Sequence, residues 1–591
     1  MMKFNKKRFI APPAECSPAY FWGINSKMDL RQLKKQLHAM YDSNLRAVCL
    51  HPYPKEWRPL AHPTDMSPDY LSREYMKKIL SLVKECEKLG MKYILYDEGG
   101  YPSGCACGKV YASNPEKFVK SYYLEENSKV HKVTMPYVPE KMASIPDLLA
   151  PGATDIFLKI THEQYKKYLH PYFGKTIDMV FCDEPSMACF TADLPKVFRQ
   201  KKGYDIEPYI DLIFTQHDKD TDIKTALIRI DYAEVMTELF QKRFLAPVHK
   251  WCKKNNLNFG GHFIREDLPS ANALNPYLSG GYGNILQALK NMDIPGVDTI
   301  ARQIFPSETA PNGSFAKYAS SVAHQSGKEL AFAEIFAVYG NGITPYQMKW
   351  VADFLMVRGI NKFVPAYFMQ KYYDTWLSGC RPHIGPHEPM WKYMHIFHDY
   401  LSRCCGLLSQ GVSANKIAFY YDIRSIWAGG KYFQEAILQH DQITKELLEK
   451  HCGFDLTDDD SIANAKITNL GLQIGKAYYT TTVLPDTQFL SNAAKQKLQE
   501  FQNLGGKVLK RNELSLAEQL ITCSIPAENL RVTKRLTDDK AIYFLMNEGQ
   551  SNLSLQITLP EKENIAICNP LDGSFSKLEI NNGTFNANFA P

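Results

Sequence analysis

VFCDEPSMACF, residues 180–190, places two adjacent acids, Asp183 and Glu184, directly after an apolar run and directly before a proline. The apolar run is typical of a strand that is buried on both faces of a parallel sheet. Acids at the end of such a strand would lie at the sheet edge where barrel enzymes carry their active sites. The stretch therefore predicts a buried parallel strand with a functional group at its carboxyl end.

Short apolar or aromatic runs recur on both sides of this stretch, separated by longer amphipathic segments. Several of these segments end near Gly or Asn, as helices commonly do. Strands that alternate with helices predict a parallel sheet, and eight strands are the number in a TIM (β/α)8 barrel. The eight runs are residues 19–25, 45–54, 91–104, 177–185, 258–263, 296–303, 329–340 and 360–368.

Nearly every run ends in a polar or aromatic residue. A single residue of this kind can be a helix cap or a turn former, and Asp183 before Pro185 would serve as one. Eight such ends in register are harder to explain in that way, and they favour an active site at the barrel mouth. The residues at these ends are Asn25, His51, Asp97, Glu98, Asp183, Glu184, His262, Arg302, Glu334 and Tyr367.

Several acids, a histidine and many aromatic rings around one mouth indicate a sugar-binding site, because aromatic faces complement a sugar ring and polar groups bind its hydroxyls. Cleavage of a glycoside requires two carboxyl groups. We predict Glu184 as the general acid and Glu334 as the nucleophile or base, since they end the fourth and seventh runs. The predicted substrate-binding residues are Asp97, Glu98, Tyr101, Asp183, His262, Glu266, Arg302, Tyr339, Tyr367 and Trp376.

Composition excludes several other functions. The 591 residues, 45% hydrophobic and 22% charged, predict two or three globular domains. The net charge of +6 is spread over 69 basic and 63 acidic residues without a cationic stripe, so nucleic acid is not an expected partner. No run suggests a secretory signal or a membrane span, which predicts a cytoplasmic protein. The expected partner is a small carbohydrate or glycoside, and the chain could form a homo-oligomer.

Two other function classes stay open at this point. A non-catalytic carbohydrate-binding protein would need the aromatic rings but not the pair of acids. A metal-dependent hydrolase or isomerase could use side chains at the strand ends as ligands. The candidate ligands are His51, Asp97, Glu98, Asp183 and His262. The 14 scattered cysteines are predicted to be reduced thiols, and no metal or cofactor is predicted from the residues.

Two longer stretches resemble a known family. YILYDEGGYPSGCACGKV, residues 93–110, looks like the corresponding segment of glycoside hydrolase family 106, the α-L-rhamnosidases, and so does SSVAHQSGKELAFAEIFAVYGNGITPYQMKWVADFLMVRGIN, residues 320–361. DEP at 183–185 looks like the acid/base strand of retaining glycosidases with TIM barrels. The resemblance implies an exo-acting enzyme that removes a terminal sugar, with α-L-rhamnose as first choice and a β-galactosidase-like retaining enzyme as alternative.

The resemblance has two further implications. Family 106 enzymes carry bound calcium, so a calcium ion is implied here by resemblance alone. They are associated with inversion, whereas glutamates on the fourth and seventh strands suggest retention. Both stereochemical outcomes therefore stay open.

The pattern changes after about residue 410. Strands and helices alternate again in 411–525, which looks like the flavodoxin-like, amidotransferase-related domain that follows the barrel in family 42 β-galactosidases. Short strands and DG turn signals in 526–591 predict a small β-sandwich-like domain. Together with a catalytic barrel in 1–410, this predicts three domains.

Overall fold

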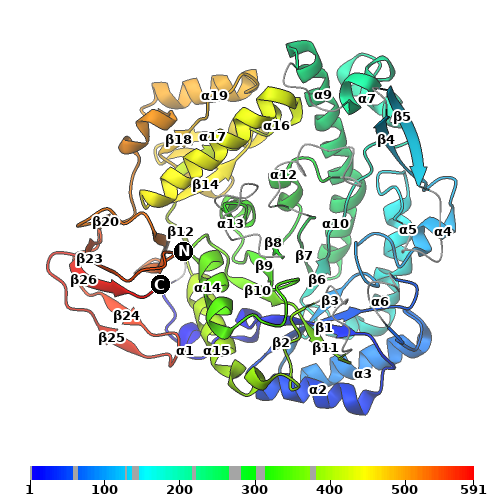
Figure 1. Ribbon diagram of the computed structural model, residues 1–591, viewed down its shortest axis with the longest axis horizontal. Coiled ribbons are helices and arrows are strands. Elements are labelled where there is room, and N and C mark those ends of the chain that lie inside the picture. Colours follow the sequence, from blue (N-terminus) through cyan, green and yellow to red (C-terminus); the bar gives the residue numbers. More distant parts are fainter. Residues whose placement is uncertain are drawn as a thin grey trace.

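The computed structural model describes residues 3–57, 64–126, 129–135, 145–215, 221–264, 266, 281–300, 313–372 and 381–591. A large parallel sheet lies in the lower half of the molecule in Figure 1, and helices pack around it. A second parallel sheet with its own helices lies above it, drawn in yellow and orange. Antiparallel strands from the C-terminal part, drawn in brown and red, lie to one side.

The large sheet has nine strands among the described residues, in the order β10-β9-β8-β7-β6-β3-β2-β1-β11. Each of the eight predicted runs contains or overlaps one of them, and all the pairings are parallel, so the predicted alternation of strands and helices is confirmed. The bounds are β1 (Ala19–Ile24), β2 (Ala47–Pro52), β3 (Lys92–Tyr96), β6 (Met179–Cys182), β7 (Asn258–Gly261), β8 (Ile294–Thr299), β9 (Phe332–Ile335), β10 (Lys362–Pro365) and β11 (Phe368–Met369).

The two ends of this strand order belong to one stretch of chain. Val364 on β10 is paired with Glu334 on β9, and Phe368 on β11 is paired with Trp22 on β1. Because β11 begins three residues after β10 ends, the short stretch 362–369 pairs with β9 through β10 and with β1 through β11. The sheet is therefore strongly curled and compatible with the predicted TIM barrel.

Side chains alternate between the two faces of the curled sheet. Phe21 and Phe181 belong to a buried cluster inside it, with ring centroids 5.2 Å apart. Their neighbours along the strands, Tyr20 and Val180, belong to the larger core that includes the surrounding helices. Since residues two apart on a strand share a face, this alternation fixes which side chains at the strand ends point inward.

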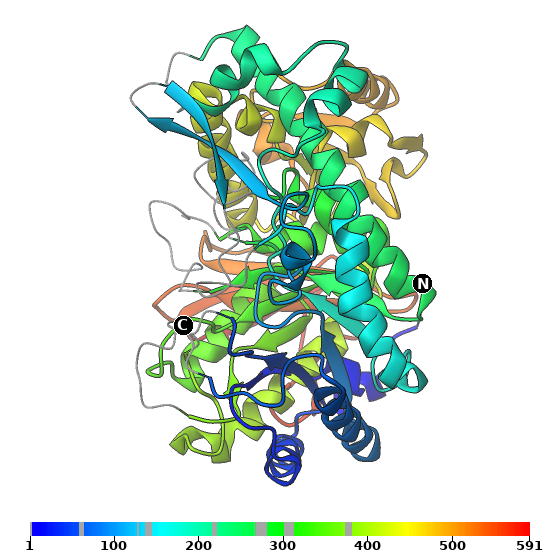
Figure 2. The same ribbon diagram turned by 90° about the vertical axis from the view of Figure 1, so that its right-hand side faces the viewer.

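Helices surround the sheet and have the expected end signals. At α3, the Ser72 hydroxyl accepts a hydrogen bond from the backbone N–H of Tyr75, and Gly90 ends the helix with a φ of 66°. The α-helices described within the first 408 residues are α1 (Lys7–Ile10), α2 (Leu30–Asp42), α3 (Arg73–Leu89), α4 (Lys109–Ser113), α5 (Ala153–Ile160), α6 (His162–Leu169), α7 (Leu194–Lys202), α8 (Ile210–Phe214), α9 (Ile223–Phe240), α10 (Ala246–Lys254), α12 (Ile285–Lys290), α13 (Ala316–Ser326), α14 (Pro345–Met356) and α15 (Met394–Leu408). A hairpin of β4 (Lys120–Glu126) and β5 (Lys129–Met135) projects at the edge of the molecule (Figure 2).

The second sheet has four parallel strands in the order β14-β13-β18-β19. Its bounds are β13 (Ile417–Tyr420), β14 (Phe454–Thr457), β18 (Thr481–Val483) and β19 (Lys507–Leu509), with helices α16 (Ile423–Ala428), α17 (Gly430–Glu449), α18 (Asp459–Ala463) and α19 (Asn492–Asn503). A small antiparallel sheet is inserted, made of β15 (Lys466–Thr468), β16 (Gly471–Ile474) and β17 (Ala477–Tyr479).

The C-terminal strands form antiparallel sheets. Their bounds are β12 (Val412–Ser413), β20 (Thr522–Cys523), β21 (Leu530–Leu536), β22 (Ala541–Asn547), β23 (Leu553–Thr558), β24 (Ala566–Cys568), β25 (Phe575–Lys577) and β26 (Thr584–Phe589). Val412 on β12 pairs with Leu536 on β21. The chain thus touches the C-terminal part before it enters the second sheet, so two paired strands fall in different predicted domains, β12 in 411–525 and β21 in 526–591.

Asp455 on β14 links the second sheet to the large one. Its buried carboxylate accepts hydrogen bonds from the Asn415 amide at 2.8 Å and the Tyr479 hydroxyl at 2.9 Å. The same carboxylate lies 2.8 Å from Nδ1 of His324 and 3.8 Å from Nζ of Lys317, both on α13. Burial opposes ionisation, but the nearby His324 and Lys317 hold the pKa of Asp455 below its usual value.

Replacing Asp455 with alanine should lower the free energy of unfolding by about 3–5 kcal/mol, because Lys317 would stay buried without its anion. Denaturant unfolding at pH 7 measures the loss. The control is Glu500→Ala on α19, which removes only an exposed pair with Lys497 and should change stability little. A loss for Asp455→Ala as small as that of the control would contradict the linking role.

Within the described ranges, no helix is both long enough and apolar enough to cross a lipid bilayer.

Candidate active site

Polar side chains form the inward-facing layer at the carboxyl end of the large sheet. Six strands each contribute one such side chain, either from the strand itself or from a residue that directly follows it. The alternation along each strand directs these side chains inward. Each is at most 5% exposed, so the layer is buried. Its members are His51, Tyr96, Asp183, His262, Asp298 and Glu334.

His262 lies between two of the acids in this layer. Its Nε2 is 2.8 Å from Oε2 of Glu334 and 3.4 Å from Oδ1 of Asp183. Burial alone would lower the pKa of His262, but the hydrogen bond to Glu334 and the charges of Asp298 and Asp183 raise that pKa well above its usual range. The imidazole is therefore positively charged at neutral pH and partly neutralises the acids around it.

Asp183 is held on both its side chain and its backbone. The Tyr96 hydroxyl donates to Oδ2 of Asp183 at 2.5 Å. The backbone N–H of Asp183 donates to the Ser103 hydroxyl at 2.8 Å, and the Ser103 N–H donates to the Asp183 carbonyl at 2.7 Å. These contacts fix the chain where it leaves the strand.

Glu184 follows in an uncommon backbone conformation. Its φ is 45°, in the left-handed region that non-glycine residues seldom adopt and that is often found at functional sites. Burial and the neighbouring Asp183 charge raise the pKa of Glu184 to about 8, and His262 opposes the shift. A carboxyl group of this kind keeps its proton at neutral pH, as a general acid requires.

Glu334 lies on β9 with different partners. Burial raises the pKa of Glu334 to about 7, while the hydrogen bond from His262 counteracts the shift. The imidazolium beside it favours the ionised form. Glu184 and Glu334 therefore lie in different electrostatic environments.

Glu266 contacts backbone in the described part of the chain. Its carboxylate accepts hydrogen bonds from the N–H groups of Phe263 at 2.6 Å and Asp298 at 3.3 Å, and it is 1% exposed. Burial raises the pKa of Glu266 to about 7. These bonds join the ends of β7 and β8, and the predicted contact between Glu266 and substrate stays a prediction.

Asp97 and Glu98 make contacts that favour a structural role. Asp97 follows Tyr96, which faces inward, so Asp97 faces the helices, where it accepts a hydrogen bond from Ser103 and lies 4.0 Å from His162 on α6. The Glu98 carboxylate accepts four backbone N–H bonds, from Gly99, Cys105, Ala106 and Cys107, at 2.6–2.9 Å. Both residues were predicted to bind sugar, and nothing in these contacts supports that prediction.

Of the predicted aromatic residues, Tyr367 lies inside the sheet, with its ring stacked 5.8 Å from Phe21. The ring of Tyr101 packs edge-on against Trp57 at 5.0 Å. Tyr339 follows β9 and is 5% exposed. The remaining predicted substrate-binding residues, Arg302 and Trp376, lie outside the described residues.

The structure brings to this site several residues that the sequence pattern did not indicate. They are Tyr96, Ser103, Asp298 and Trp57. Asp298 interrupts the apolar run GVDTI, and Trp57 lies three residues after the end of the second run. Asp298 could have been found from the alternation along its strand if the strand end had been placed at Thr299 rather than at Gln303.

Asp183, His262 and Glu334 each offer one ligand atom within 4.8 Å of the others, a spacing that a metal ion could use. One of the three donors is an imidazole, whereas Ca²⁺ takes six to eight oxygen ligands. This group therefore does not fit the calcium ion that the family resemblance implies. It is closer to a set for zinc or another transition metal.

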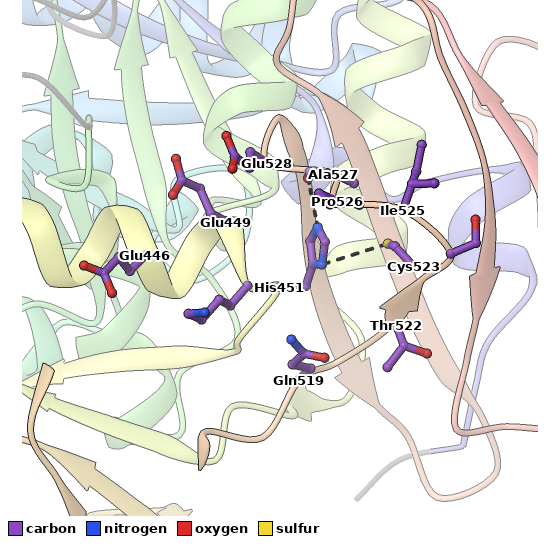
Figure 3. Close-up of a pocket in the computed structure, with 12 residues that line it drawn as sticks. Glu446, Glu449, His451, Gln519, Thr522, Cys523, Ile525, Pro526, Ala527 and Glu528 are labelled. Atoms are coloured by element: carbon purple, nitrogen blue, oxygen red, sulfur yellow. Dashed lines mark hydrogen bonds between the residues drawn. The ribbon is translucent and has the colours of Figure 1, made fainter. Parts of the chain in front are cut away.

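A cavity of about 600 Å³ lies elsewhere, between the end of α17 and residues 519–528 (Figure 3). His451 lies in it with Nε2 3.2 Å from the Ala527 carbonyl and Nδ1 4.0 Å from Sγ of Cys523. Glu446 and Glu449 of α17 line its other side. Its lining includes none of the acids at the large sheet.

Buried acids at the carboxyl end of a curled parallel sheet are an arrangement that glycoside hydrolases with barrels use. Residues 136–515 match the model of glycoside hydrolase family 106, described as alpha-L-rhamnosidase. The chain belongs to this family, and the predicted resemblance is confirmed.

Individual proteins are more distantly similar. A putative beta-glucuronidase from Formosa agariphila is 22% identical over 418 residues, 68% of this chain and 32% of that protein, so the chain spans about a third of that curated relative. The structure of a rhamnosidase from Novosphingobium sp. PP1Y superposes with a TM-score of 0.73 at 12% identity, over 99% of this chain and 82% of that one. A family 42 beta-galactosidase from G. stearothermophilus gives a TM-score of 0.61 at 9% identity, over 97% and 99%. At such identities the structures share the fold.

Glu98→Ala should lower the free energy of unfolding by about 3 kcal/mol or more, because four backbone N–H groups would lose their buried acceptor. Thermal and denaturant unfolding measure the loss. Glu74→Ala on α3, which removes only a surface contact with Lys78, serves as the control. A Glu98→Ala protein of unchanged stability and raised KM would instead support the predicted contact with sugar.

Proposed function

We propose that this protein is an exo-acting glycoside hydrolase that removes a terminal α-L-rhamnose from a glycoside or oligosaccharide. The observation that supports the proposal is the group of acids at the carboxyl end of the curled sheet, where His262 bonds Glu334 and lies 3.4 Å from Asp183, the neighbour of Glu184. We take this sheet to be a TIM barrel closed by residues 362–369, whose mouth is where barrel enzymes bind substrate.

In the proposed reaction, Glu184 gives its proton to the oxygen that leaves the sugar. Glu334 either attacks the anomeric carbon or takes a proton from the attacking water. His262 donates its hydrogen bond to Glu334 and keeps it ionised and oriented for either task. Tyr96 and His262 orient Asp183, whose charge favours the protonated form of Glu184.

The remaining parts are proposed to be structural. The order β14-β13-β18-β19 corresponds to strands 2-1-3-4 in chain order, as in flavodoxin-like folds, which supports a flavodoxin-like domain in 411–525. The antiparallel sheets support a separate β-domain in 526–591. We further propose that the substrate is a small carbohydrate and that the protein works in the cytoplasm without a cofactor.

A β-galactosidase-like retaining enzyme is the second candidate. It is favoured by the positions of the two glutamates, on the fourth and seventh strands of the large sheet in chain order, as in retaining barrel glycosidases. Nitrophenyl α-L-rhamnoside, β-D-galactoside and β-D-glucuronide distinguish the candidates by which one is hydrolysed. Activity that a chelator abolishes and zinc or manganese restores would favour metal chemistry at Asp183, His262 and Glu334 instead.

Glu184→Gln should slow hydrolysis by roughly 10²–10⁴-fold, and less for a leaving group that needs no proton. Because only protonated Glu184 is active, wild-type kcat/KM should fall about tenfold per pH unit above about pH 8, and the variant should lose this fall. Rates for a series of aryl glycosides across pH 5–10 test both points. Equal slowing for good and poor leaving groups would contradict the role as acid.

Glu334→Gly should be nearly inactive on all substrates, because it removes the second carboxyl group. Azide should restore turnover on an activated aryl glycoside by entering the space left free. A glycosyl azide of inverted configuration relative to the substrate indicates a retaining nucleophile, whereas inversion by the wild-type enzyme makes Glu334 the base. Near wild-type turnover of Glu334→Gly would falsify the two-carboxyl mechanism.

A further inference from the structure

Asp298 lies in the polar layer of the site and has no role in the mechanism above. It is the fifth residue of β8, and it is paired in register with Glu334 on the neighbouring strand. Residues paired across parallel strands point to the same face, so both carboxyl groups face inward. Asp298 is 3% exposed.

The backbone N–H of Asp298 has a hydrogen-bond partner, but Oδ1 of its carboxyl group has none among the residues that the structure describes. Its N–H donates to Glu266 at 3.3 Å. Its Oδ1 is buried and makes no hydrogen bond to any described residue. The neighbouring acids differ, since Asp183 is bonded by Tyr96 and Glu334 by His262.

A buried carboxyl oxygen without a partner costs about 1–3 kcal/mol, and such groups are rare in folded proteins unless a function or a bound molecule uses them. Burial, together with the nearby charges of Glu334, Glu184 and Glu266, raises the pKa of Asp298 well above its usual value. The unpartnered Oδ1 can accept a hydrogen bond. A sugar hydroxyl is a group that can donate one.

We propose that Asp298 binds one hydroxyl group of the sugar ring held between Glu184 and Glu334, and that it determines which sugar the enzyme accepts. The proposal rests on the function proposed above and adds a residue that recognises the substrate. A site built to bond a hydroxyl rejects an analogue that lacks it, because the buried polar group is then left unpaired.

The test combines substrate analogues with variants. Wild-type, Asp298→Ala and Asp298→Asn enzymes are assayed on nitrophenyl α-L-rhamnoside and on its 2-, 3- and 4-deoxy analogues. For wild type, one analogue should lose roughly 10–100-fold in kcat/KM beyond the others. In Asp298→Ala, kcat/KM for the parent substrate should fall by a similar factor. For that same analogue, kcat/KM should then be little lower than for the parent.

Asp298→Asn keeps the size of the side chain, and it covers the case that the alanine variant folds poorly. It should retain part of the discrimination, because an amide can still bond a hydroxyl. Asp178→Asn is the matched control, since Asp178 lies before β6 at the opposite end of the sheet in a surface pair with Lys92. It should behave as wild type on every analogue.

The outcomes separate the two proposals. If wild type hydrolyses neither the rhamnoside, the galactoside nor the glucuronide parent, the proposed function fails. If another parent is hydrolysed, its own deoxy series replaces that of the rhamnoside. Suppose that wild type is active but that kcat/KM of each Asp298 variant falls by the same factor on the parent and on every analogue. Asp298 then acts only through the charge balance of the site, and its role in recognition is overturned.

Discussion

The arrangement of the site depends on one cation among several buried acids. Carboxyl groups placed together away from water cannot all be ionised, because each negative charge raises the pKa of the others. His262 bonds Glu334 and lies near Asp183, and its charge offsets part of this repulsion. The acid next to the imidazole can be ionised, while Glu184, which has a charged neighbour in Asp183, keeps its proton. Contact with the imidazole thus favours the ionised form of Glu334 over that of the other acids.

This balance requires a rigid backbone, and the loop after β3 provides it. Glu98 gathers four N–H groups of residues 99–107 onto one carboxylate. Ser103, which lies in that loop, then bonds the backbone of Asp183 on both sides. A conformation such as that of Glu184 persists only when its surroundings determine it strongly. The glycine-rich YDEGGYPSG segment therefore acts as a scaffold for the acid on the next strand.

Much of the fold could be predicted from sequence, because buried parallel strands are near-continuous apolar runs and their order follows the chain. The polar strand ends could also be predicted, because a polar residue stands out where an apolar run stops. His262, Asp183 and Glu334 come together as expected. Which face of the sheet each side chain of a strand occupies could not be predicted. Asp97 faces the helices because Tyr96, one residue earlier, faces inward. The pairing of β12 with β21 was equally hidden, since it joins residues more than 120 positions apart through backbone bonds that leave no local pattern.

The second parallel sheet shows why its carboxyl edge need not bind a ligand. In open α/β sheets that edge is the usual binding site. Here Asp455 contacts α13, and Asp458, directly after β14, accepts hydrogen bonds from Asn284 and Gln287 at the start of α12. The helices α12 and α13 flank β8, the strand that carries Asp298. Asp455 within β14 and Asp458 directly after it therefore bind the helices on either side of this strand, so the second sheet is anchored to the elements that position β8.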